Sequence, residues 1–229
     1  MDRDEEKRAA AETAAGMVED GMVIGLGTGS TAHFAIEALI RRVREGLRIR
    51  AIPTSERSAA QARSGGIPLT TFAEHRRLDL TIDGADEIEL GTLNLIKGLG
   101  GALLREKIVA AISARLVIVA DHEKLVDRLG TTTPVPVEVV PFGWETTADR
   151  LHRLGADPQP RRGPDGQLFS TDGGNRILDC RFGAIADPES LDRTIGQTVG
   201  VVETGLFIGM AEVALIADAA GVRAIRRSD

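Results

Sequence analysis

A glycine-rich turn near the start of the chain constrains the fold more than any other feature. The segment Gly25-Leu26-Gly27-Thr28-Gly29-Ser30 closes an apolar run, residues 22–26, that is typical of a buried strand. After Ser30, apolar residues recur every three to four positions as far as Val43, which indicates a helix with one buried face. A strand, a glycine turn and a helix in this order form the basic unit of a layered α/β fold.

The same alternation continues along the next hundred residues. Short apolar runs predict strands at 49–52, 78–82 and 116–120, and helical patterns predict helices at 55–64 and 103–114. We therefore expect an α/β fold whose first part is a sheet of mostly parallel strands covered by helices.

The residue composition of the sequence changes near Gly130. Residues 131–142 are rich in proline and β-branched residues, which predicts a domain crossing and an edge strand. A helix at 146–154, strands near Leu168 and Ile177, a helix after Pro188 and a strand at 199–203 complete the order βαββαβ. Residues 207–225 again resemble strands of the first part. We expect a catalytic domain (1–130 and 205–229) with a smaller, inserted α+β domain (131–204) of ferredoxin-like type.

Composition narrows the class of protein. The chain has 229 residues, a net charge of −6 and a sequence pI near 5.4, so it would repel nucleic acid and anionic membranes. No apolar run approaches the roughly 20 residues that span a bilayer, and the charged start does not resemble a secretory signal. Cys180 is the single cysteine and the four histidines form no close pair, so neither a disulfide nor a metal site is predicted. We expect a cytoplasmic globular protein.

The glycine turn itself is a candidate anion site. Glycines allow close approach of the backbone to a ligand, and a helix N-terminus offers free N–H groups. A dinucleotide site would have glycine in place of Ser30 and an acidic residue after the second strand, where the chain reads Pro53-Thr54-Ser55. A Walker loop would need Gly-Lys-Ser/Thr, which is absent. A site for a phosphate monoester remains, beside the alternative of a tight turn capped by serine.

Two aspartates, Asp83 and Asp86, follow an expected strand. The carboxyl ends of strands in an α/β sheet face the ligand crevice, where two carboxylates could accept hydrogen bonds from a polyol. If they lie close together, each would raise the pKa of the other. An Asx-turn that caps a helix is the structural alternative.

Lys97 and Glu106 form a second candidate pair. Lys97 begins a glycine-rich segment, and Glu106 lies on an apolar helix without a partner of opposite charge three or four residues away. Partial burial would raise the pKa of Glu106 toward the working pH and make it a plausible general base. A buried salt bridge, for instance with Lys97, is the alternative. Nothing local decides the role of Lys124.

Together these segments resemble the type A ribose-5-phosphate isomerase family. The similar blocks are GLGTGSTA, TSERSAAQA, DGADEIE, NLIKGLGGALLREKI, PVEVVPF, LDCRFG and GLFIGMAEVALI, in the order of the family. They span the chain from about Lys7 to Ile225.

The resemblance implies a Rossmann-like domain that carries the site, a smaller domain with a lid or oligomerisation role, no metal, no cofactor, and a homodimer or homotetramer. It implies interconversion of D-ribose 5-phosphate and D-ribulose 5-phosphate through an enediolate, in the non-oxidative pentose phosphate pathway. Glu106 would be the base, Lys97 would stabilise the enediolate, and Asp83 and Asp86 would hold the sugar and assist proton movement. The implied substrate-binding residues are Thr28, Gly29, Ser30, Thr31, Asp83, Gly84, Ala85, Asp86, Lys97, Gly98, Leu99, Gly100 and Lys124, with Lys7 nearby.

Two other classes of protein remain as alternatives. A sugar-phosphate deaminase or CoA-transferase-like enzyme would share the architecture, but a deaminase needs a ring-opening histidine that none of these blocks contains. A non-catalytic sugar-phosphate sensor would be expected to carry a DNA-binding domain as well.

Overall fold

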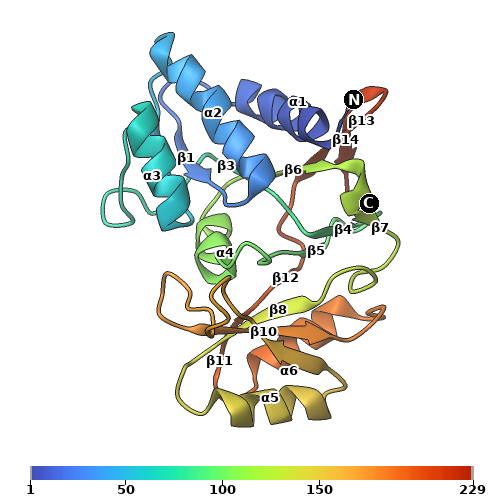
Figure 1. Ribbon diagram of the computed structural model, residues 1–229. Helices are drawn as coiled ribbons and strands as arrows, with labels where there is room; N and C mark the ends of the chain where they lie inside the picture. Colours follow the sequence, from blue (N-terminus) through green and yellow to red (C-terminus); the bar gives the residue numbers. More distant parts are fainter. Residues whose placement is uncertain (1, 228–229) are drawn as a thin grey trace.

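A six-stranded sheet forms the upper half of the molecule in Figure 1, a computed structural model that describes residues 2–227. Its strand order is β14-β13-β6-β3-β1-β2, and every neighbouring pair is parallel except β13 with β14. The bounds are β1 Val23–Leu26, β2 Arg50–Pro53, β3 Leu80–Asp83, β6 Leu116–Asp121, β13 Val213–Asp218 and β14 Gly221–Arg226. The parallel sheet expected from the first part of the sequence is therefore confirmed.

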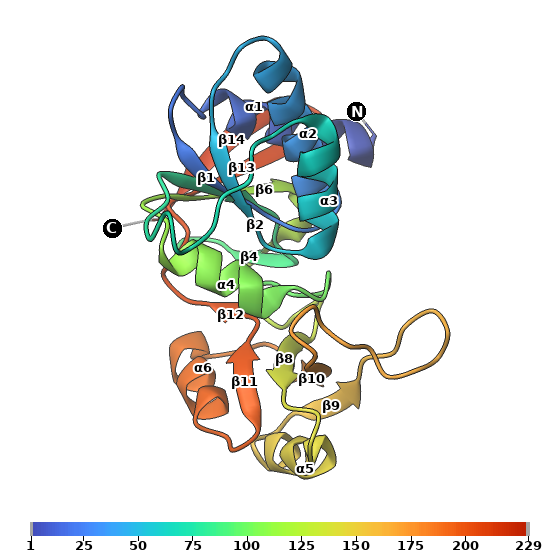
Figure 2. The same ribbon diagram turned by 90° about the vertical axis from the view of Figure 1, so that its left-hand side faces the viewer.

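Helices cover both faces of this sheet (Figures 1 and 2). On one face, α1 (Arg3–Gly16), α2 (Ser30–Arg44) and α3 (Glu56–Gly65) contribute mainly alanine, isoleucine and leucine to a large apolar core. On the other face, α4 (Leu103–Ala111) buries Ala110 in a cluster with Leu116 and Val109 in a cluster with Ile52. This arrangement places the first turns of α2 and α4 at the carboxyl ends of β1, β3 and β6.

A four-stranded antiparallel sheet forms the lower half, with strand order β11-β8-β10-β9. Its elements follow the chain as β8 (Val135–Val139), α5 (Trp144–Arg153), β9 (Asp157–Pro160), β10 (Arg176–Arg181), α6 (Pro188–Gly196) and β11 (Val201–Thr204). Leu151 of α5 and Ile195 of α6 join the apolar core of the sheet. The order is the predicted βαββαβ, and the strand arrangement is ferredoxin-like. The exact domain boundaries and the lid or oligomerisation role stay predictions.

A third, small sheet lies between the two larger ones and was not predicted. It has the order β12-β5-β4-β7 and consists of β4 (Glu87–Glu89), β5 (Leu95–Ile96), β7 (Leu125–Val126) and β12 (Leu206–Phe207). A short 3₁₀ helix, η1 (His122–Lys124), precedes β7. Strands this short carry too little periodicity to be recognised in a sequence.

Two strand predictions in the lower sheet are wrong. The second strand is Asp157–Pro160, whereas Leu168 makes only an isolated bridge with Arg162. Two prolines are tolerated in β9 because it is an edge strand. The backbone N–H of Arg161 donates to the carbonyl of Ile177 in β10. Backbone N–H groups of an antiparallel strand point alternately to its two sides, so the nitrogens of Pro158 and Pro160 face away from β10, at the open edge of the sheet.

The predicted edge strand is in fact internal. β8 pairs with β10 on one side and β11 on the other. The carbonyl of Pro136 accepts a hydrogen bond from the N–H of Gly205. The nitrogen of a strand residue points to the same side as its carbonyl, so the missing N–H of Pro136 falls just beyond the last register pair of β8 with β11.

The charged start of the chain, for which no element was predicted, forms α1. Asp2 and Glu5 make a capping box at its N-terminus, and its alanines pack against the sheet. Alanine is only weakly apolar, so the helical repeat of the buried alanines is hard to recognise among the charged residues of this segment. No helix among residues 2–227 has the length and apolar character needed to cross a membrane.

Candidate active site

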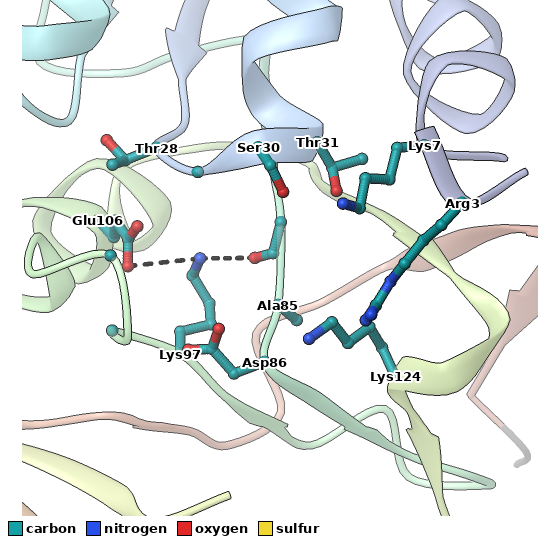
Figure 3. A pocket seen from close by; sticks show the side chains of 14 residues that line it. Arg3, Lys7, Thr28, Ser30, Thr31, Ala85, Asp86, Lys97, Glu106 and Lys124 are labelled. Carbon is teal, nitrogen blue, oxygen red and sulfur yellow. Dashed lines mark hydrogen bonds and ion pairs between the residues drawn. The ribbon is translucent and has the colours of Figure 1, made fainter. Parts of the chain in front are cut away.

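A cavity of about 320 Å³ opens at the carboxyl ends of β1, β3 and β6 (Figure 3). Most of the predicted site residues line it: Thr28, Gly29, Ser30, Thr31, Gly84, Ala85, Asp86, Lys97, Gly98, Gly100, Glu106 and Lys124. Asp83 lies buried behind the wall of the cavity, and Leu99 is exposed beside it. Lys7 and Arg3 from α1 also line the cavity, and Arg3 was not predicted.

The glycine turn ends in the open N-terminus of α2. Gly29 is the N-cap with a φ of +123°, a conformation that favours glycine, and no side chain caps the helix. The first turn of α2 carries no acidic residue. Its free N–H groups and the hydroxyls of Ser30 and Thr31 therefore suit an anion.

Gly27 is required for a different reason. A Cβ atom at this position would lie 2.1 Å from Oδ1 of Asp83. Glycine thus lets Asp83 approach the turn closely, where its Oδ1 accepts hydrogen bonds from the backbone N–H groups of Thr28 (3.1 Å) and Gly84 (2.8 Å). Asp83 ties the ends of β1 and β3 together.

Lys97 is the centre of a buried charge cluster. Its Nζ donates to the carbonyl of Gly84 at 2.6 Å and lies 3.0 Å from Oδ2 of Asp83 and 3.4 Å from Oε2 of Glu106. Burial alone would lower the pKa of Lys97, but the nearby carboxylates of Asp83 and Glu106 outweigh it and raise that pKa. Lys97 is therefore a permanent cation. Figure 3 shows the side chain of Lys97 pointing toward Glu106, and a dashed line marks their ion pair.

Glu106 lies in the first turn of α4 and is 2 % exposed. Burial raises the pKa of Glu106 to about 8, and the charges of Asp83 and Asp86 act in the same direction while Lys97 opposes them. Its Oε2 has no hydrogen-bond partner within residues 2–227. A carboxylate of this pKa that faces a cavity is well suited to take up and return a proton near neutral pH.

Asp86 differs from Asp83 in facing the cavity. Its Oδ2 accepts a hydrogen bond from the backbone N–H of Leu99 at 2.9 Å. Burial raises the pKa of Asp86 above its ordinary value. The hydrogen bond from Leu99 and the charges of Lys97, Lys124 and Arg161 act in the opposite direction but do not cancel this effect. The other oxygen of Asp86 is available to a hydroxyl in the cavity.

The opposite end of the cavity is cationic. Lys7, Arg3 and Lys124 lie there, on the side of Ser30 and Thr31 (Figure 3). Arg3 is held by Asp121 at 3.4 Å and Glu123 at 3.0 Å. No local pattern in the sequence could have shown that the start of α1 reaches this site, because Arg3 and Lys124 are brought together only by the packing of α1 against β6.

The two neighbours of Glu106 anchor its helix. They have no partner along α4, but Nη1 of Arg105 lies 2.9 Å from Glu56, and Nζ of Lys107 lies 2.8 Å from Glu203. The helix is thus tied to α3 on one side and to β11 of the lower sheet on the other. Among residues 2–227, no three His, Cys, Asp or Glu side chains are grouped so that they could hold a metal ion.

Fold and site together define an α/β enzyme that transfers protons on a small anionic substrate. A buried carboxylate and a fixed ammonium lie at one end of its cavity, and the N-terminus of α2 with cationic side chains lies at the other. The sequence of residues 50–221 matches the family model of ribose 5-phosphate isomerase A (phosphoriboisomerase A). The chain belongs to the ribose 5-phosphate isomerase A family.

Relatives and solved structures agree with this assignment. A ribose-5-phosphate isomerase A from Gloeobacter violaceus is 59% identical over 228 residues, which cover 100% of this chain and 99% of that protein. The ribose 5-phosphate isomerase A structure from Methanocaldococcus jannaschii is 40% identical, with a TM-score of 0.93 and coverage of 97% of this chain and 99% of that one. A D-ribose-5-phosphate isomerase solved with phospho-erythronic acid is 36% identical, with a TM-score of 0.96 and coverage of 99% and 100%.

Proposed function

We propose that this chain interconverts D-ribose 5-phosphate and D-ribulose 5-phosphate through an enediolate intermediate. The observation that carries the proposal is the Glu106–Lys97 pair, 3.4 Å apart, at the end of the cavity opposite the anion site. The 36% identical relative was solved in complex with phospho-erythronic acid, a phosphorylated sugar acid, and the cavity here offers such a molecule cations at one end and a lysine at the other.

The reaction starts with removal of the C2 proton of the open-chain aldose by Glu106. Negative charge then develops on the oxygen at C1, and the ammonium of Lys97 is already in place to stabilise it. One preorganised donor of this kind is typically worth about 3–4 kcal/mol in the transition state. A proton passes from the C2 oxygen to the C1 oxygen, and Glu106 returns its proton to C1, which yields the ketose.

The two aspartates have different parts in this proposal. Asp83 holds Lys97 and the ends of β1 and β3, since both of its carboxylate oxygens are engaged with the protein. Asp86 faces the cavity and accepts a hydrogen bond from a sugar hydroxyl, assisting ring opening or the proton transfer between oxygens.

The phosphate is bound at the other end of the cavity. The N-terminus of α2 supplies backbone N–H groups and the hydroxyls of Ser30 and Thr31, and Lys7, Lys124 and Arg3 supply positive charge. Binding energy from the phosphate thereby holds C1 and C2 beside Glu106 and Lys97.

The direct test is an assay with ribose 5-phosphate in the presence of EDTA. The purified protein should form ribulose 5-phosphate, and chelation should leave the rate unchanged, because the proposed steps use only side chains of the chain itself. Loss of activity in EDTA that a divalent ion restores would overturn the proposed chemistry. A cytoplasmic location, expected from the composition, and assembly into a homodimer or homotetramer, implied by the family resemblance, remain proposals.

A further inference from the structure

Arg161 connects the lower sheet to the site without lining the cavity. It directly follows β9, and its side chain is mostly buried. Nε of Arg161 donates to Oδ2 of Asp179 at 2.9 Å, and Nη2 donates to Oδ1 of the same carboxylate. This two-point contact holds the guanidinium in one plane.

The remaining nitrogen of Arg161 reaches the glycine-rich segment that follows Lys97. Nη1 donates to the carbonyl of Gly98 at 2.7 Å and to the carbonyl of Leu99 at 3.1 Å. The N–H of Leu99 in turn donates to Asp86 at 2.9 Å. The peptide unit between Gly98 and Leu99 is therefore held at both ends, its oxygen by Arg161 and its nitrogen by Asp86.

This peptide unit needs such a restraint. Gly98 has a φ of +110°, and glycine is the residue with the greatest conformational freedom. Gly100 and Gly101 follow closely, and the N–H of Gly101 donates to the same carbonyl of Gly98 at 3.0 Å, so Arg161 reinforces a local turn in this glycine-rich segment. A rotation of the Gly98–Leu99 peptide would move the backbone of Lys97 on one side and release Asp86 on the other.

We propose that Arg161 is a positioning residue of the isomerase: by fixing the Gly98–Leu99 peptide, it aims Lys97 and Asp86 at the reacting end of the sugar. The inference rests on the proposed function for its catalytic consequence, but its structural part, the restraint of residues 97–101, is independent of any activity. A misplacement of about 1 Å in a catalytic group can lower a rate by about 100-fold.

The test compares Arg161→Ala with Arg115→Ala, a control that removes another two-point arginine–carboxylate contact. Arg115 binds Glu212 at 2.7 and 3.3 Å, beside the amino end of β6 and away from the cavity. Arg161→Ala should lower kcat at least 10-fold and change KM by less than 3-fold, because the phosphate end of the cavity is untouched. Arg115→Ala should keep kcat within 2-fold of the wild type.

Hydrogen–deuterium exchange without substrate supplies the readout that does not depend on activity. Peptides covering residues 97–101 should exchange at least 5-fold faster in Arg161→Ala than in the wild type, and at the wild-type rate in Arg115→Ala. If wild-type protein proves inactive on ribose 5-phosphate, the proposed function fails while the exchange result still decides the restraint. Unchanged exchange, or a kcat within 2-fold of the wild type, overturns the role of Arg161.

A second variant, Asp179→Asn, tests the same proposal if Arg161→Ala does not fold. Asp179→Asn keeps the arginine and its bonds to the two carbonyls but weakens the anchor that holds the guanidinium. It should lower kcat by a smaller factor, about 3-fold to 10-fold, with faster exchange in residues 97–101. A folded Asp179→Asn protein with wild-type kcat and wild-type exchange contradicts the proposal.

Discussion

The ammonium of Lys97 lies 3.4 Å from Oε2 of Glu106, farther than the roughly 2.7–2.9 Å of a charge-assisted hydrogen bond. The two side chains therefore form an ion pair in which the glutamate oxygen keeps a free lone pair. Lys97 gives its closer contacts to Gly84 and Asp83. The carboxyl group of Glu106 is thus held near a cation without being saturated by it, which suits the role of base proposed for it.

Replacement of Glu106 by glutamine keeps the shape of the side chain and removes the base. Because general base catalysis typically contributes about 10²–10⁴-fold, kcat should fall by that factor or more, with KM nearly unchanged. In deuterated water the wild type should exchange the C2 proton of the sugar, and the variant should not.

Glu138→Gln is the matched control for this change. Glu138 is also buried, but it lies in β8 and accepts hydrogen bonds from Thr171 and Asn175, away from the cavity. Its replacement should affect melting temperature and leave kcat near the wild-type value. A folded Glu106→Gln enzyme with normal turnover would move the base to Asp86.

The pH dependence should follow the ionisation of Glu106. Only its carboxylate accepts a proton, so kcat/KM, which reports the free enzyme, should rise with pH and reach half of its maximum near the pKa of about 8. The measurement is a pH–rate profile at ribose 5-phosphate concentrations well below KM. A profile that is flat between about pH 6.5 and 9 would show that another group is the base.

The ionisation of Glu106 should also change the free energy of unfolding, which should fall as pH rises. The folded pKa of Glu106, about 8, lies above its ordinary value of 4.5, so the folded protein binds more protons in this window. The stability from the neutral, buried carboxyl group is fully present below about pH 4.5 and is lost as pH rises through 8. The melting temperature of Glu106→Gln, relative to the wild type, should therefore increase with pH over this range.

Replacement of Lys97 by glutamine should damage both catalysis and stability. Loss of one preorganised donor typically lowers kcat by about 10²–10³-fold. Removal of one partner from a buried ion pair typically costs about 3–5 kcal/mol, because Asp83 and Glu106 lose their common cation. Lys107→Gln, whose ammonium faces Glu203 and not the cavity, should lose at least ten times less activity. Equal losses of kcat in the two variants would refute the proposed role of Lys97.

A negative charge at the N-terminus of α2 should weaken substrate binding. Thr31→Glu places a carboxylate beside the proposed phosphate site, so KM for ribose 5-phosphate should rise at least 10-fold through repulsion. Thr146→Glu makes the same change in the first turn of α5, on the exposed surface of the lower half, and should leave KM unchanged. An unchanged KM in a folded Thr31→Glu protein would place the phosphate elsewhere.

Local patterns were sufficient for most elements around the site. The helix that carries Glu106 was expected at 103–114 and spans Leu103–Ala111, and the strand before Asp83 was expected at 78–82 and spans Leu80–Asp83. The helix is recognisable because its buried residues recur every three to four positions, and the strand because it is a short continuous apolar run. β9 was missed for the opposite reason: Pro158 and Pro160 argue against a strand until its position at the sheet edge is known.

The sequence by itself determined the α/β class, the glycine turn before α2 and the candidate groups Glu106, Lys97, Asp83 and Asp86. These follow from periodicity and from residue types at strand ends, which act over a few residues. Tertiary structure alone decided that Asp86 faces the cavity while Asp83 lies behind it, and that Arg3 and Arg161 reach the site at all. Contacts between residues far apart in the chain depend on how sheets and helices pack, and no local pattern encodes that packing.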